Sequence, residues 1–323
     1  MNTSPLSRVG RIGLGCATFG REIAEEQAFA VMDHAVKLGI RLFDTAEAYG
    51  GGQARLYRKN TLGADDVREE SGEMHSSEKI VGRWMKSRGT RGDIVLLTKV
   101  TTNFTRDHVR QALSASLERL QTDAVDLYLY HSFDAATPVE QACLAMNDAV
   151  RSGRVRAAGC SNYSGAQIEE ALALCESQGL AHFEVAENAY SLVSREIELD
   201  LLPIAARRRI GVLTYSPLAA GFLLGKYSRD RSSIPKGTRF DVIPGHADVY
   251  FNDRNFRAVD RLKELAVRAG LPVERFAMAW VLENPAVDTV LVGARTTRHL
   301  DNAVEAVNTQ LRWEWLAEID QWE

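Results

Sequence analysis

Four polar residues follow short apolar segments of the chain, and their side chains together could transfer a proton. Asp44 and Tyr49 stand in FDTAEAYG, Lys99 follows IVLLT, and His131 follows VDLYLY. Tyrosine has an ordinary pKa of about 10, so it acts as an acid or base at neutral pH only where positive charge favours its phenolate. Lys99 could supply that charge. The set therefore indicates acid–base chemistry.

Each of these residues also has a structural explanation when it is taken alone. Asp44 could cap a helix, and Tyr49 could be an ordinary core aromatic. Lys99 could extend along apolar surface toward solvent, and His131 could be a buried, hydrogen-bonded imidazole. Their occurrence together favours function. A lysine near a carboxylate and a histidine also suits imine chemistry, so a Schiff-base lyase that uses Lys99 is a second hypothesis.

Short apolar, β-branched segments alternate with longer amphipathic ones, which is typical of βαβ units around a parallel sheet. The eight predicted strands are 11–15, 41–44, 94–99, 125–130, 155–159, 183–186, 210–215 and 289–292. Predicted helices include 25–38, 105–121, 138–152 and 164–178, and the first, third and fourth are each followed by a glycine that could end the helix in a left-handed conformation. Eight units predict a parallel (β/α)8 TIM barrel, although a doubly wound open sheet gives a similar pattern.

In such a barrel, catalytic groups gather at the carboxyl ends of the strands, where Asp44, Lys99 and His131 are expected. We expect one barrel domain over residues 1–323. Two segments interrupt its rhythm: 50–76 is polar and rich in glycine and charge, and 227–253 is punctuated by proline and glycine. Both could lie at the active-site face.

The composition excludes several classes of function. A net charge of -4 and a pI near 6.0 give no field that attracts nucleic acid or anionic membrane. The four cysteines are widely separated, which favours free thiols over disulfides or a metal site. The N-terminus does not resemble a secretory signal, and no apolar run is long enough to span a membrane. We expect a soluble, cytoplasmic protein, either a monomer or a homo-oligomer.

Six motifs together resemble those of the aldo-keto reductases: FDTAEAYG, LLTKV, YLYHSFD, GCSNYS, YSPLAAGFLLGKY and VLVGART. The resemblance covers nearly the whole chain. It looks closest to the bacterial sugar-type reductases and to the β-subunit group of voltage-gated potassium channels. It implies a (β/α)8 barrel that uses NADP(H) to interconvert an aldehyde or ketone and its alcohol, with sugars and sugar-derived carbonyls among the candidate substrates.

The resemblance implies a role for each polar residue. Tyr49 would be the general acid toward a bound carbonyl, and Lys99 would depress the pKa of Tyr49. Asp44 would hold Lys99, and His131 would orient the substrate oxygen. The similarity to channel subunits also permits a regulatory subunit that binds nucleotide and turns over slowly, which is a third hypothesis.

The cofactor would lie extended across the barrel rim, since the chain lacks the G-x-G-x-x-G fingerprint of a dinucleotide-binding open sheet. By resemblance, Ser161, Asn162 and Glu187 would hold the carboxamide, and Tyr215 would stack on the nicotinamide ring. The other expected cofactor residues, besides Asp44 near the nicotinamide, are Ser216, Pro217, Leu218, Ala219, Lys226, Arg239, Gly293, Ala294, Arg295 and His299. Two guanidiniums near the adenosine phosphate would favour NADPH over NADH.

The chain departs from the family pattern in three places. Glu187 stands where the family usually has glutamine, and an ionised carboxylate only accepts hydrogen bonds. At the adenine, the family's acidic residue and asparagine fall on Asn302 and Ala303. Segment 50–76 adds about two dozen residues between AYG and SEKIVG. We expect this insertion to line the substrate site and restrict substrates; the alternative is a disordered surface loop.

Overall fold

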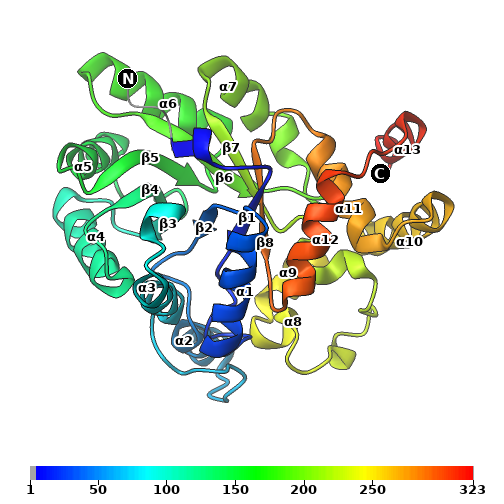
Figure 1. The fold of residues 1–323 in the computed structure, drawn as a ribbon. Helices are drawn as coiled ribbons and strands as arrows, with labels where there is room; N and C mark the ends of the chain where they lie inside the picture. Colours follow the sequence, from blue (N-terminus) through cyan, green and yellow to red (C-terminus); the bar gives the residue numbers. More distant parts are fainter. Residues whose placement is uncertain (1–4, 323) are drawn as a thin grey trace.

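The computed structural model describes residues 5–322, and its eight strands form a closed parallel barrel (Figure 1). The strands are β1 (Ile12–Gly15), β2 (Leu42–Asp44), β3 (Val95–Val100), β4 (Val125–Tyr130), β5 (Val155–Ser161), β6 (Phe183–Ala189), β7 (Gly211–Tyr215) and β8 (Thr289–Gly293). Each strand pairs with its neighbours in chain order, and β1 also pairs with β8. The predicted (β/α)8 barrel is confirmed, and the open-sheet alternative is wrong.

Helices surround the strands (Figure 1). They are α1 (Glu25–Lys37), α2 (Gly51–Leu62), α3 (Ser76–Arg88), α4 (Arg106–Leu120), α5 (Val139–Arg151), α6 (Gly165–Gln178), α7 (Leu201–Arg208), α8 (Arg239–Val242), α9 (Gly245–Tyr250), α10 (Asp253–Ala269), α11 (Val273–Glu283), α12 (Thr297–Val307) and α13 (Trp313–Ile319). The sequence explains both ends of α6: Ser164 and Gln167 form a capping box at its start, and Gly179 ends it in the left-handed region. No helix in the described part of the chain is long and apolar enough to cross a membrane.

Two strands extend two or more residues beyond their predicted ends. β5 continues to Ser161 and β6 to Ala189, beyond the predicted ends at 159 and 186. The added residues are partly polar, so the sequence pattern does not predict a strand there. In the structure, however, Ser161 pairs with Glu187 and Asn188 pairs with Thr214 in the sheet. Strand pairing satisfies their backbone groups and carries these side chains to the rim.

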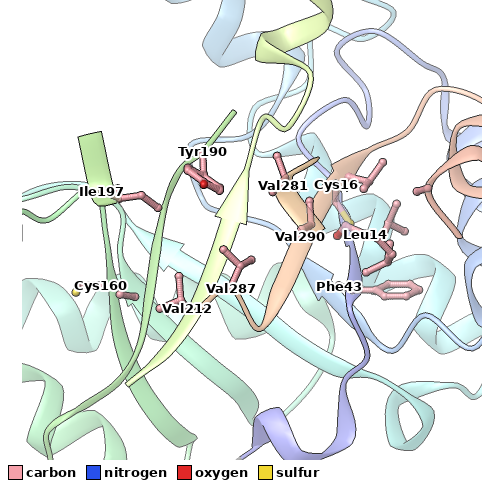
Figure 2. Packing of buried hydrophobic residues seen from close by; sticks show 14 of the residues in the cluster. Leu14, Cys16, Phe43, Cys160, Tyr190, Ile197, Val212, Val281, Val287 and Val290 are labelled. Atoms are coloured by element: carbon pink, nitrogen blue, oxygen red, sulfur yellow. The ribbon is translucent and has the colours of Figure 1, made fainter. Parts of the chain in front are cut away.

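Two hydrophobic clusters fill the molecule. The smaller one lies inside the barrel and consists of Leu42, Val95, Leu97, Leu127, Leu129, Ala157, Val185, Leu213 and Leu291. The larger one joins the other face of the strands to the helices, as in the stacking of Phe43 on Trp84 at 5.2 Å. Figure 2 shows part of it, with Leu14, Phe43, Val212 and Val290 contributed by four different strands.

The alternation of side chains along a strand explains why functional groups appear at one end of the barrel interior. Because every second residue faces inward, Asp44 continues the inward row of Leu42, and Lys99 continues that of Val95 and Leu97. By the same alternation Glu187 continues the row of Val185 on β6. The apolar interior thus passes into a polar layer at the carboxyl ends of the strands.

The insertion forms ordered structure, so its interpretation as a disordered loop is wrong. It contains α2, and the chain then returns to α3 through residues 63–75. The return segment pairs with the loop after β1, where the Ser71 amide donates to the Gly20 carbonyl at 3.1 Å. The first residue of α2, Gly51, must be a glycine, because a Cβ at this position would lie 1.8 Å from the Ser71 carbonyl oxygen.

The segment after β7 is irregular, as expected, but it is not featureless. It holds a distorted 3-10 segment, η4 (Ala219–Leu224), and the short helices α8 and α9. Ser216, Ala219 and Ala220 adopt left-handed backbone conformations with φ of 56°, 49° and 57°. Such conformations cost about 1–2 kcal/mol for each non-glycine residue, so the surrounding structure must hold this turn in place.

Candidate active site

Lys99 lies at the centre of the polar layer and is fully buried. Its ammonium forms an ion pair with Asp44 of β2 and lies 3.2 Å from a carboxylate oxygen of Glu187 on β6. It also lies 3.4 Å from the carbonyl oxygen of Thr45 and 3.5 Å from the hydroxyl of Tyr49. One cation therefore joins two carboxylates and a phenol that come from separate parts of the chain.

Tyr49 and His131 complete the group predicted from the sequence. Tyr49 lies in the loop after β2, and its ring packs edge-on against the His131 ring, with centroids 5.3 Å apart at 84°. The Lys99 ammonium is 5.1 Å from the centroid of the Tyr49 ring. The structure thus brings together Asp44, Tyr49, Lys99 and His131.

Burial and charge fix the protonation of these groups. Burial alone would lower the pKa of Lys99, but the carboxylates of Asp44 and Glu187 raise it well above its ordinary value. Burial, together with the charge of Lys99, lowers the pKa of His131 to about 3. At neutral pH the site therefore holds a charged lysine beside a neutral imidazole.

Lys99 lowers the pKa of Tyr49 as expected, but burial outweighs this effect. Burial raises the pKa of Tyr49 above its ordinary value, and Lys99 only partly reverses that shift. Asp44 and Glu187 add to the increase because their negative charge disfavours a second anion. Tyr49 is thus a neutral phenol at neutral pH, and Lys99 makes it a stronger acid than burial alone would leave it.

The ends of β5, β6 and β7 form a second group of polar side chains. Asn162 follows β5 in a left-handed conformation, and its amide nitrogen donates to the His131 carbonyl at 2.8 Å and to the Ser161 hydroxyl at 3.1 Å. Its amide oxygen accepts from the Tyr215 hydroxyl at 2.7 Å. Asn162 therefore links the strand that precedes His131 to the aromatic ring at the end of β7.

Glu187 is the buried member of this second group. One of its carboxylate oxygens contacts Lys99, while the other is buried without a hydrogen-bond partner in the described part of the chain. A buried, unpartnered polar atom beside Ser161 and Asn162 is suited to a polar ligand such as a carboxamide. The residues present here fit the nicotinamide end of the expected cofactor.

Cations gather near the loop that follows β8. Burial and the charge of Arg295 lower the pKa of Lys226, and burial together with both cations lowers the pKa of His299. Within residues 5–322, neither Lys226 nor Arg295 forms an ion pair with a carboxylate. Two like charges held close together without an anion are suited to a phosphate group.

Two expected cofactor residues have other contacts in the structure. Arg239 forms an ion pair with Glu22 at 3.0 Å and donates to His246 at 3.3 Å, while Glu22 also pairs with Arg21 at 2.9 Å, so two guanidiniums share one carboxylate. His299 accepts at Nδ1 from the backbone amides of Arg295 and Thr296, each at 3.2 Å, and thereby caps the start of α12. His299 positions the Arg295 backbone.

The remaining expected residues lie on the two loops that flank these cations. Ser216, Pro217, Leu218 and Ala219 form the left-handed turn after β7, while Gly293 ends β8 and precedes Ala294. The Ala294 carbonyl accepts from Thr18 at 3.1 Å. At the expected adenine end, Ala303 is fully buried in the core and Asn302 is partly exposed, so only Asn302 could contact a ligand.

Sequence reasoning missed the residues that attach the insertion to the rest of the barrel. Arg58 on α2 is fully buried, pairs with Glu69 at 2.7 Å, and donates to the Val242 carbonyl at 2.8 Å. Arg68 donates to the Asp241 carbonyl at 2.7 Å. The charge-rich sequence of the insertion carries no periodic signal that distinguishes Arg58 from its exposed neighbours.

The match of this chain to known proteins agrees with the geometry. The model of the aldo/keto reductase family matches residues 11–323. The chain is 32% identical to the "Uncharacterized oxidoreductase YrpG" of Bacillus subtilis (strain 168) over 318 residues, which cover 94% of this chain and 89% of YrpG.

Two further relatives are similar over comparable lengths. The "Probable voltage-gated potassium channel subunit beta" of Oryza sativa subsp. japonica is 31% identical, with 93% of this chain and 88% of the relative covered. "Protein tas" of Escherichia coli (strain K12) is 29% identical, with 97% and 93% covered. With the barrel and its polar rim, these matches establish that the chain belongs to the aldo/keto reductase family.

Proposed function

We propose that this oxidoreductase uses NADP(H) to reduce an aldehyde or ketone to its alcohol, with Tyr49 as the general acid. The observation that carries the proposal is the contact of 3.5 Å between the Tyr49 hydroxyl and the buried Lys99 ammonium. Family membership supports an oxidoreductase that acts on small molecules. A sugar or sugar-derived carbonyl is the substrate class that the resemblance favours.

The residues at the rim suit the two ends of the cofactor. Ser161, Asn162 and Glu187 would hold the carboxamide, with Tyr215 against the nicotinamide ring. Lys226 and Arg295, which form no ion pair with a carboxylate within residues 5–322, would bind phosphate oxygens. The Arg295 guanidinium would favour NADPH over NADH, because a 2′-phosphate offers it a bidentate anion. When bound, the nicotinamide supplies the hydride, while the protein supplies orientation and charge.

The side chains of the chain perform the proton chemistry. Tyr49 holds a proton at neutral pH and donates it to the carbonyl oxygen of the substrate as negative charge develops there. The Lys99 ammonium stabilises the resulting phenolate, and Asp44 keeps Lys99 in place. His131 is neutral and can donate a hydrogen bond to the same oxygen without competing as an acid.

Replacing Tyr49 by phenylalanine tests the proposal. We expect Tyr49→Phe to bind NADPH with nearly the affinity of the original protein and to lose about 10²–10⁴-fold in turnover, because only the proton donor is removed. Tyr57→Phe on α2 is the control, since this tyrosine is partly exposed and lies outside the rim group. Binding is measured by NADPH fluorescence, and turnover by its absorbance with a panel of aldehydes, quinones and sugars. A Tyr49→Phe variant with a near-normal rate would rule out Tyr49 as the acid.

The lyase hypothesis finds little support in the site. A Schiff base requires a neutral lysine amine, but the buried ion pair with Asp44 holds Lys99 in its charged form. Borohydride trapping with carbonyl substrates provides the test, since only a lyase would become covalently labelled at Lys99.

The regulatory hypothesis is supported by the relative from Oryza sativa, whose name is a probable channel β subunit. All four proton-transfer residues are present, so the enzyme remains the primary proposal. NADPH binding without turnover of any substrate in the panel would favour the regulatory role. A cytoplasmic location belongs to the same proposal, and the four buried, free cysteines are consistent with it.

A further inference from the structure

Glu187 occupies a position at which its charge is poorly compensated. Its side chain is 2% exposed, one oxygen lies 3.2 Å from the Lys99 ammonium, and the other has no hydrogen-bond partner in the part of the chain that the structure describes. Burying a carboxylate oxygen without a partner is costly, because the protein does not replace the water that the ion loses.

The titratable groups that interact electrostatically with Glu187 come from four other strands and the loop after β2. They are Asp44 on β2, Tyr49 in the loop after β2, Lys99 on β3, Cys160 on β5 and Tyr215 on β7. Lys99 is the one cation in this group. With both carboxylates ionised the cluster carries one uncompensated negative charge, whereas with Glu187 protonated it is neutral.

The geometry assigns the extra proton to Glu187. The Asp44 carboxylate makes the closer contact with Lys99, while Glu187 contacts the same ammonium at 3.2 Å through one oxygen. In agreement, burial and the nearby Asp44 raise the pKa of Glu187 to about 8, although Lys99 opposes the shift. At neutral pH the free oxygen of Glu187 therefore carries a hydroxyl proton, which it can donate.

We propose that Glu187 is a proton-carrying positioning residue, which stays protonated while the cofactor is bound and donates its O–H to the oxygen of the nicotinamide carboxamide. Glutamine at this position would offer an N–H donor at every pH, whereas glutamic acid offers a donor only in its neutral form. This inference rests on the proposed use of NADP(H), and it makes cofactor affinity dependent on one proton.

The sign of the pH effect follows from linkage. At pH values below the pKa of Glu187, the O–H donor is present, and the ionisation of Glu187 does not change the affinity for NADPH. Above it, binding must first restore the proton, so the Kd for NADPH increases by up to about tenfold for each pH unit. Cofactor binding at alkaline pH should therefore take up close to one proton per molecule.

The same proton affects the proposed acid. Glu187 and Asp44 both raise the pKa of Tyr49 through their negative charge. When Glu187 is neutral, one of these two charges is removed and the Tyr49 phenol becomes a stronger acid. Reduction should thus slow as Glu187 ionises, in addition to the effect on cofactor binding.

NADPH titrations of the purified protein between pH 6.5 and pH 9.5 test this inference, with a range set to bracket the ionisation of Glu187. We compare the original protein with Glu187→Gln, which keeps a donor at all pH values, and with Glu187→Leu, which has none. We expect the affinity of the original protein to fall with pH relative to Glu187→Gln, and that of Glu187→Leu to be weak throughout. Calorimetry at alkaline pH in buffers of different ionisation enthalpy measures the proton uptake.

Lys226 provides an internal control. Burial and Arg295 lower the pKa of Lys226, so its loss of charge also weakens phosphate binding at alkaline pH. That loss is common to the original protein and to Glu187→Gln, so the ratio of their affinities isolates Glu187. Circular dichroism verifies that each variant is folded.

Parallel affinity curves for the original protein and Glu187→Gln, or binding without proton uptake, would overturn the inference and leave the proposed function intact. Failure of the original protein to bind NADPH at any pH would overturn the proposed function, and the inference with it. An infrared carbonyl band of a protonated carboxylic acid, present in the original protein and lost in Glu187→Gln, would support the inference without any cofactor.

Discussion

Replacing Arg58 by alanine should release the insertion from the barrel. The Arg58 guanidinium is 0% exposed and pairs with Glu69, which is 1% exposed, at 2.7 Å. It also donates to the carbonyls of Val242 and Asp66 at 2.8 and 2.9 Å. Its removal would leave the Glu69 carboxylate buried with the Arg68 amide as its remaining donor.

The magnitude follows from that unpaired charge. Breaking a buried ion pair by removing one partner costs about 3–5 kcal/mol, and the amide that remains on Glu69 places the expected cost near the lower end. If local opening of residues 51–75 costs less than global unfolding, the segment opens first. We therefore expect a loss of about 3 kcal/mol in the free energy of unfolding, or rapid proteolytic cleavage within 51–75.

Arg55 offers a matched control on the same helix. It pairs with Asp65 at 2.9 Å, but both side chains are more than two-fifths exposed, at 43% and 44%. Exposed ion pairs contribute little, so Arg55→Ala should leave stability and proteolysis nearly unchanged. The double variant Arg58→Ala/Glu69→Ala should lose less than the sum of its single changes, since no buried charge is left unpaired. Urea unfolding and limited proteolysis measure both effects, and equal stability of Arg58→Ala and Arg55→Ala would refute this reasoning.

Lys226→Met should weaken NADPH binding by roughly ten- to a hundredfold, which corresponds to the free energy that a hydrogen bond to a charged group contributes. Lys236→Met, in the same exposed segment, should leave NADPH binding unchanged. A fluorescence titration that shows equal Kd values for both variants would remove Lys226 from the phosphate site. Burial and Arg21 lower the pKa of His246 from about 6.5 to about 4, so in the unfolded state this histidine binds its proton at higher pH than in the folded state. The stability that the neutral His246 contributes is thus present above pH 6.5 and lost as the pH falls toward 4. Urea unfolding should show a smaller decline over this range for His246→Gln, and identical pH profiles would contradict the assignment.

The barrel and the position of its polar layer were predictable because both depend on local periodicity. Inward-facing Leu42 and Val95 define rows that Asp44 and Lys99 continue, and each row ends at the same rim. Residue type at the strand ends then indicated the chemistry. The extension of β5 to Ser161 was missed because pairing with β6, and not local hydrophobicity, determines where that strand ends.

Other features depend on contacts between distant residues and have no local signal. The burial of Arg58 depends on Val242, which lies 184 positions further along the chain. The left-handed conformations of Ala219 and Ala220 are imposed by the surrounding fold, since alanine does not favour them. The net increase in the pKa of Tyr49 depends on how completely the site excludes water, which only the coordinates reveal.

The residues of the polar layer fall into two successive segments of the sequence, because the strands of the closed barrel follow one another in chain order. Asp44, Tyr49, Lys99 and His131 all lie within the first 131 residues, and the proposed nucleotide contacts of the later strands and loops begin at Ser161. Recombination between related barrels near residue 135 could therefore exchange acid–base chemistry and nucleotide preference as separate blocks. The contact between Lys99 and Glu187 crosses that junction, so hybrid genes would need these two codons to be inherited as a compatible pair.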